Sequence, residues 1–233
     1  MRRLLTSLVV LLVLLVAADR LTSLYAEHRV ATSLRDTETL GSTPSVHIHG
    51  FPFLTQLFRG HYDDVQVVAH DFTRADVVRI DSVDVHLHGV KLPLSDALSG
   101  SAKRVPVDHV DGVAVIAYSS LDRAHDGLTF SYAGTGRIKV TGGVSVLGQS
   151  VQAAATGRIS LHGDAFVVSV DSVSVGGAQA PQAVTSVVSG AFGVTTSLPT
   201  LPFHFTLKSV RATARGIEIG GSADDIVLET GGR

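Results

Sequence analysis

Apolar and polar residues alternate over most of the chain after residue 44, and this feature constrains the fold most. The clearest case is residues 83–88, Val-Asp-Val-His-Leu-His, in which every second side chain is apolar. This period matches a β-strand, because successive side chains of a strand point to opposite faces. We therefore expect an α+β fold, mostly β, built on a long antiparallel sheet. Comparable segments predict further strands at 45–49, 65–69, 113–118, 128–132, 137–141, 144–147, 152–161, 165–175, 203–213, 217–220 and 226–229.

A basic and apolar leader opens the chain. Arg2 and Arg3 precede an apolar run from Leu4 to Ala18 that only two hydroxyl residues interrupt. About 15 apolar residues suit the core of a signal peptide and fall short of the ~20 that span a bilayer comfortably. Small residues at the end of the run offer a cleavage site, whereas an uncleaved anchor would continue into the next helix. We expect 1–18 to be a signal peptide or signal anchor and the protein to be exported.

An amphipathic helix is predicted directly after the leader, over residues 19–36, because apolar and charged residues recur on opposite faces. The apolar face holds Leu21, Leu24, Tyr25 and Leu34, and the charged face holds Arg20, Glu27, Arg29 and Arg35. Two shorter helices are predicted at 94–98 and 181–188. No linker rich in proline or serine follows the leader, so 19–233 is interpreted as a single domain.

Composition argues against several classes of function. The net charge is -2 and no stripe of lysine or arginine occurs, so nucleic-acid binding is not expected. The chain has no cysteine, which removes disulfides and thiol nucleophiles. Residues 143–147 lack the final glycine of a nucleophile elbow, and residues 134–139 lack the third glycine of a dinucleotide turn. We expect no enzyme activity and no cofactor, although dispersed Ser, His and Asp residues leave chemistry open.

Eleven histidines raise the question of a metal site. His47 and His49 fall on one face of a predicted strand, as do His86 and His88. Neither pair has a carboxylate partner at obvious ligand spacing in the sequence, and no cysteine supports a metal. Solvent-facing histidines are therefore the favoured interpretation, with no metal expected. Clustered histidines that make binding sensitive to pH are a milder alternative.

Two apolar blocks interrupt the strand pattern. Residues 50–60, Gly-Phe-Pro-Phe-Leu-Thr-Gln-Leu-Phe-Arg-Gly, place three of the nine phenylalanines between glycines. Pro52 prevents this block from being an interior strand. It is either a plug that closes the end of the sheet or an aromatic lip at an apolar pocket or bilayer interface. Residues 198–207 form the second block, in which Phe203 and Phe205 alternate with polar residues after two prolines.

These segments together resemble the actinobacterial DUF2993 family of LmeA-like phospholipid-binding proteins. The likeness rests on the leader that runs into a helix, on the 50–57 block with Gly60 and Tyr62 after it, and on several strand motifs. These motifs lie at 89–94, 128–142, 201–203, 209–213 and 216–217. The resemblance implies a cell-envelope or periplasmic protein that binds phospholipids, such as phosphatidylinositol-type lipids, and one member class is tied to lipomannan elongation. It also implies a tubular lipid-binding fold, in which a curved antiparallel sheet wraps a helix.

The leading hypothesis is an apolar groove that holds phospholipid acyl chains, each buried methylene contributing ~0.8 kcal/mol. The alternative is a membrane-tethered adaptor that recruits an envelope glycosyltransferase and carries no lipid. For the headgroup we nominate Arg59, His61 and Lys91. The candidate lipid-binding residues are Leu24, Phe51, Phe53, Leu54, Leu57, Phe58, Phe192, Leu201, Phe203 and Phe205.

Overall fold

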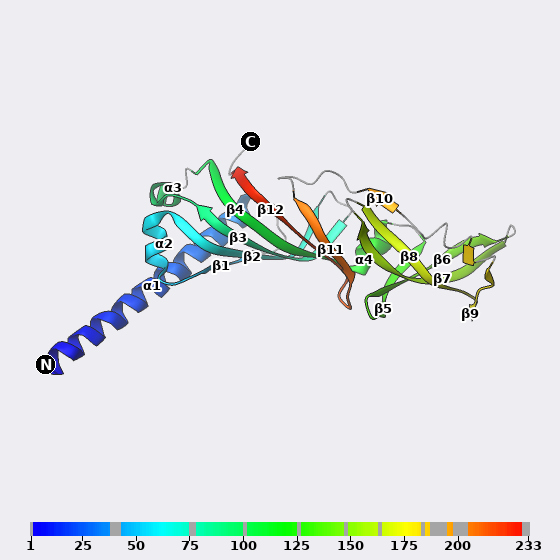
Figure 1. Cartoon of the computed structure of the whole chain (residues 1–233), viewed down its shortest axis with the longest axis horizontal. Coiled ribbons are helices and arrows are strands. Elements are labelled where there is room, and N and C mark those ends of the chain that lie inside the picture. The colour runs from blue at the N-terminus through cyan, green and yellow to red at the C-terminus, as the bar shows by residue number, and fades with distance from the viewer. Residues whose placement is uncertain are drawn as a thin grey trace. The chain divides into compact units, whose positions relative to one another are not determined.

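The computed structural model shows a protein dominated by β-strands, with a long helix at its N-terminus (Figure 1). It describes residues 2–37, 43–74, 78–99, 102–124, 127–146, 149–162, 165–182, 185–186, 195–197 and 205–229. The described strands form two antiparallel sheets, so the α+β, mostly β class is confirmed. The strand order is β1-β2-β3-β4-β12-β11 in the first sheet and β10-β8-β7-β6-β5 in the second, where β9 pairs with β8.

The helices are α1 (Arg2–Thr37), α2 (Phe53–Arg59), α3 (Leu94–Ser99) and α4 (Tyr118–Ala124). The strands of the first sheet are β1 (Ser45–His49), β2 (His61–Arg74), β3 (Val78–Lys91), β4 (Arg104–Ile116), β11 (Thr206–Ala212) and β12 (Ile217–Glu229). Those of the second sheet are β5 (Leu128–Gly134), β6 (Arg137–Val146), β7 (Gln149–His162), β8 (Ala165–Val175), β9 (Ala178–Gln179) and β10 (Thr195–Ser197).

Most of the predicted strands lie where the alternation places them. The strands at 45–49 and 165–175 have the predicted bounds, whereas 137–141 and the described part of 144–147 belong to one strand, β6. The segment predicted as a strand over 113–118 includes the start of α4, and Val113 is exposed although burial on both faces was expected. The alternation cannot detect this change, because Tyr118 fits the end of an apolar strand and the start of a helix equally well.

The chain divides into two compact units, each with its own buried residues. The first unit comprises 1–69, 84–111 and 223–233, and the second comprises 70–83 and 112–222. In the second unit, Ile138 and Val140 of β6 form a core cluster with Ala212, and Phe130 packs against it. Strands β2, β3, β4 and β12 contribute residues to both units.

The first unit contains the features that concern function. Helix α1 packs against β1 and α2 (Figure 1). Val46, Phe53, Tyr62, Val90, Val105, Val107, Val110 and Ile226 are buried apolar residues of this unit.

Helix α1 confirms the predicted helix after the leader and joins it to the leader without a break, over 36 residues. The prediction of its packing face is wrong. Leu21, Leu24 and Tyr25 are exposed, whereas Asp19 and Ser23 are buried. The buried face combines Ala31 with polar residues, because α1 supplies hydrogen-bond acceptors to the elements on which it packs.

Candidate functional site

The block 50–60 folds into a tight loop followed by helix α2. Phe53 is only 1% exposed and its ring lies 6.3 Å from that of Tyr62, centroid to centroid. Burial raises the pKa of the Tyr62 hydroxyl. Gln56 is also buried; its Nε2 donates to the carbonyl of His49 and its Oε1 accepts from the backbone N–H of Asp63. The inner half of this block is therefore a packed anchor, and the protein itself covers the predicted lipid contact Phe53.

The carboxylate of Asp19 caps helix α2 from outside. Pro52 occupies the N-cap position and has no side-chain acceptor, so the first N–H groups of α2 need a partner from elsewhere. Asp19 Oδ1 accepts a hydrogen bond of 2.8 Å from the backbone N–H of Leu54. Its negative charge also suits the positive end of the helix dipole. The cap fixes α2 against α1 one residue after the apolar run ends at Ala18.

A second carboxylate of α1 accepts a hydrogen bond from a backbone N–H group at the edge of the first sheet. In the part of the chain that the structure describes, β1 is an edge strand, and no strand lies beside its outward-pointing N–H groups. Glu27 Oε1 accepts a hydrogen bond of 2.9 Å from the backbone N–H of Ile48. Asp19 and Glu27 explain why α1 buries a polar face. Both were missed in the sequence, where Glu27 was placed on the solvent side.

The outer half of the 50–60 block carries exposed aromatic side chains. Phe58 is 74% exposed and Phe51 is 57% exposed, while Leu54 and Leu57 are half-buried. The guanidinium of Arg20 lies over the Phe51 ring, 5.1 Å from its centroid, as a cation–π contact. Leu24 is 61% exposed on the neighbouring helix. Five of the predicted lipid contacts thus remain open to a ligand or bilayer at this end of the first unit.

Of the four remaining predicted lipid contacts, the structure describes one. Phe192, Leu201 and Phe203 lie outside the described residues. Phe205 belongs to the second unit, where it is half-buried with its ring close to Gly221.

The first sheet presents one apolar and one polar face within the first unit. Ile48 pairs with Val65 and Val46 with Val67 in the β1–β2 register. The apolar residues Ile48, Val65, Val67, Val85 and Leu87 are all half-buried, whereas Val46 is buried. A row of valine and leucine side chains that stays partly exposed is a surface on which hydrocarbon could pack.

The three residues nominated for the headgroup lie near one another. Arg59 ends α2 and His61 begins β2, and the carbonyl of Gly60 between them accepts a hydrogen bond of 2.9 Å from Leu92 N–H. This bond brings the end of β3, with Lys91, beside them. Lys91 forms an ion pair with Asp108, so its charge is already matched.

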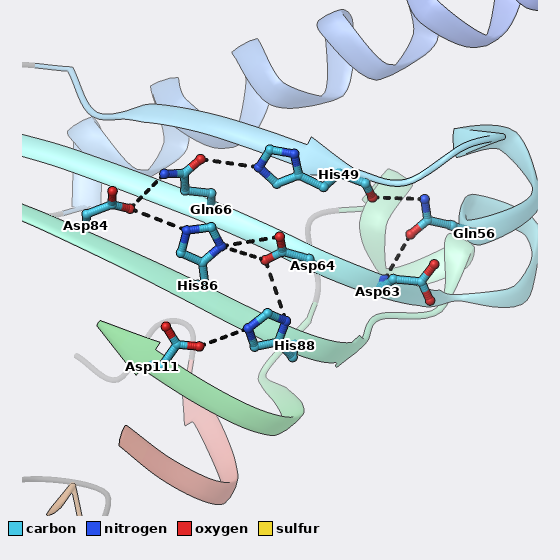
Figure 2. Close-up of polar contacts among 9 residues, drawn as sticks. All are labelled: His49, Gln56, Asp63, Asp64, Gln66, Asp84, His86, His88 and Asp111. Carbon is cyan, nitrogen blue, oxygen red and sulfur yellow. Dashed lines mark hydrogen bonds and ion pairs between the residues drawn. The ribbon is translucent and has the colours of Figure 1, made fainter. Parts of the chain in front are cut away.

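The polar face carries a row of histidines and aspartates (Figure 2). The His86 and His88 rings stack at 6.0 Å, His49 stacks on His86 at 6.1 Å, and His109 stacks on His88 at 5.9 Å. Asp64 of β2 lies between His86 and His88 of β3. The histidine pairs were recognised in the sequence, whereas Asp64 was not, because its place beside them depends on the register between two strands.

The described residues contain one helix that is long enough and apolar enough to cross a membrane. It is α1, over Arg2–Thr32. Length and composition alone support this statement, and an N-terminal signal sequence has the same properties.

The fold and its surface define a β-rich protein with an apolar N-terminal helix and exposed phenylalanines beside the end of the apolar run. A model of the family described as LmeA-like phospholipid-binding matches residues 17–222, and the chain belongs to this family. The resemblance drawn from the sequence is thereby confirmed. Comparison with curated proteins and with solved structures gave no match.

Proposed function

We propose that the protein is an exported cell-envelope protein that holds phospholipid acyl chains at the outer face of the cytoplasmic membrane. Membership of a phospholipid-binding family supports the lipid ligand. The observation that supports this position for the site is the exposure of Phe51, which contacts Arg20, and of Phe58 on α2, the helix that Asp19 caps just after the apolar run of α1. No step of this function requires catalysis by the protein.

The position of α2 supports contact with the bilayer surface. Asp19 links α2 to α1 immediately after Ala18, where the apolar run ends. If α1 stays in the membrane, α2 lies at the level of the lipid headgroups, where aromatic side chains are favoured. Arg20 and Arg59 would there meet lipid phosphates. Helix α2 and the loop before it would then present Phe51, Leu57 and Phe58 to the acyl chains of the outer leaflet.

Acyl chains taken up from this position have an apolar surface available in the same unit. The half-buried row on β1, β2 and β3 offers valine, isoleucine and leucine side chains. Each methylene removed from water contributes ~0.8 kcal/mol, so a single chain supplies considerable affinity without polar contacts. Arg59, His61 and Lys91 would face a phosphatidylinositol-type headgroup. Lipid transfer or lipoglycan assembly of the lipomannan type is the role that such a cargo would serve.

Site-specific photo-crosslinking tests the proposal in the full-length protein in membranes. We replace Phe58, and separately Phe51, with a benzophenone amino acid and irradiate in the presence of radiolabelled phosphatidylinositol. The matched control carries the probe at Tyr132, an exposed aromatic residue of the second unit. Labelled lipid on the Phe51 and Phe58 probes, above the Tyr132 level, is the expected result.

Two outcomes contradict parts of the proposal. If neither phenylalanine probe crosslinks to lipid, this end of the first unit does not contact the lipid. Crosslinking to a protein in place of lipid would favour the adaptor that recruits an envelope glycosyltransferase. In that case Phe58→Asp should abolish capture of the partner while the copurified lipid, measured by mass spectrometry of an organic extract, stays unchanged.

A further inference from the structure

Asp64, His86 and His88 place three potential metal ligands around one point on the polar face of the first sheet. Asp64 Oδ1 lies 3.0 Å from His86 Nδ1 and 3.8 Å from His88 Nδ1. One ligand atom from each residue lies within 4.8 Å of the others. Metal–ligand bonds of ~2.1 Å at tetrahedral angles place neighbouring ligand atoms about 3.4 Å apart. The two distances from Asp64 bracket that separation.

The outer nitrogens of both rings face carboxylates. His88 Nε2 lies 2.9 Å from Asp111 Oδ1, and His86 Nε2 lies 3.8 Å from Asp84 Oδ1. Histidines that bind metals usually donate their second N–H to a carboxylate, which fixes the tautomer and makes the free nitrogen a better ligand. This arrangement leaves both Nδ1 atoms directed at Asp64 and both Nε2 atoms directed away from it (Figure 2).

The surroundings hold the ligands in place. Asp84 Oδ1 also accepts a hydrogen bond of 2.8 Å from Gln66, whose Oε1 lies 3.2 Å from His49 Nε2. The ligand rings lie between the stacked rings of His49 and His109. Strands β2 and β3 carry all three ligands, and the side chains of Asp64, His86 and His88 are 24%, 32% and 40% exposed. The site is thus partly buried and open to ions from solution.

We propose that Asp64, His86 and His88 bind a divalent first-row transition metal ion, with Zn²⁺ as the expected ion. Two imidazoles and one carboxylate, without thiolate, suit this class of metal. His86 lies between the carboxylates of Asp64 and Asp84, and His88 lies between those of Asp64 and Asp111, so a divalent cation at Asp64 would offset part of the negative charge of this cluster. Three protein ligands leave one coordination position for water or another oxygen donor. The proposal is independent of lipid binding, because none of these residues belongs to the proposed lipid contact.

Zn²⁺ titration by isothermal calorimetry tests the site in the full-length protein, prepared in detergent without a polyhistidine tag. The expected result is one ion per chain. His86→Ala, His88→Ala and the isosteric Asp64→Asn should each weaken binding by more than ~100-fold, beyond the ~10–100-fold loss typical of outer partners. Asp111→Asn, which leaves the ligands intact, should fall within that range. His162→Ala, at an exposed histidine of the second unit, is the control and should bind as the wild type.

A second measurement tests the geometry and does not depend on the variants folding. Long-range ¹H–¹⁵N spectra of the Zn²⁺-loaded wild type should show Nδ1 bound to metal and the proton on Nε2 for both His86 and His88. Binding that Asp64→Asn and both alanine variants leave unchanged would overturn the proposal. So would equal weakening by His162→Ala, metal on Nε2, or no Zn²⁺ affinity in the wild type.

Discussion

Phe53 and Phe58 belong to the same seven-residue helix and should respond in opposite ways to truncation. Phe53 is 1% exposed and contacts Tyr62, whereas Phe58 is 74% exposed. Truncating a buried phenylalanine to alanine costs about 3–5 kcal/mol, because transfer energy is lost and a cavity remains. An exposed substitution changes stability by about 0.5 kcal/mol or less. We therefore expect Phe53→Ala to lower the free energy of unfolding several-fold more than Phe58→Ala.

Urea unfolding of the full-length protein in nonionic detergent measures this difference. The chain has four tyrosines and no tryptophan, so tyrosine fluorescence reports on the fold, and Tyr62 reports directly on the Phe53 site. With a denaturant slope of ~2 kcal/mol per M, a loss of about 3–5 kcal/mol moves the midpoint down by roughly 1.5–2.5 M. A shift below ~0.5 M for Phe53→Ala, or an equal shift for Phe58→Ala, would refute the division of this block into an anchor and an exposed edge.

Three further predictions concern single contacts. Asp19→Ala removes the cap of α2 and should cost about 0.5–2 kcal/mol in urea unfolding, whereas Asp19→Asn keeps an acceptor and should cost less. Gly157→Ala brings a Cβ within 2.2 Å of Ser169 O on β8 and should lower the free energy of unfolding by about 1–3 kcal/mol, unlike Gly143→Ala, whose nearest contact is 3.5 Å. The hydrogen bond from Arg137, with Arg158 nearby, lowers the pKa of Asp171 from its ordinary value of 3.8. The ionised Asp171 carboxylate therefore stabilises the fold above pH 3.8, and this stabilisation is lost as the pH falls through the lowered pKa. A carboxyl ¹³C titration should show that the pKa of Asp171 returns toward 3.8 in Arg137→Gln.

The strands could be predicted from sequence because a period of two is a local property. Residues 45–49 and 165–175 needed only their own side chains to be recognised as strands. The division into two sheets could not be predicted in this way, since strand partners far apart in the chain decide it. Helix α4 was not predicted, for a related reason. The Tyr118 hydroxyl donates a hydrogen bond to the carbonyl of Thr213, far away in the sequence, and its ring packs against the core of the second unit.

The packing face of α1 shows where an amphipathic pattern misleads. The pattern assigns charged residues to solvent, but Asp19 and Glu27 face the protein because Leu54 N–H and Ile48 N–H need acceptors. A pattern within one helix carries no information about the backbone groups that another element leaves unpaired. The same limit applies to the histidine cluster, where His86 and His88 were visible as a pair and Asp64 was not.

The continuous course of α1 through Ala18 and Asp19 has a consequence for maturation. In the folded protein these residues are helical, and Asp19 is buried where its carboxylate caps α2, so the bond between them is not available to a peptidase. If the leader is a signal peptide that is cleaved here, the cut would therefore have to come before α1 docks on α2. If the leader is instead an uncleaved anchor, the same continuous helix would connect the membrane segment directly to the residues that pack against α2 and β1.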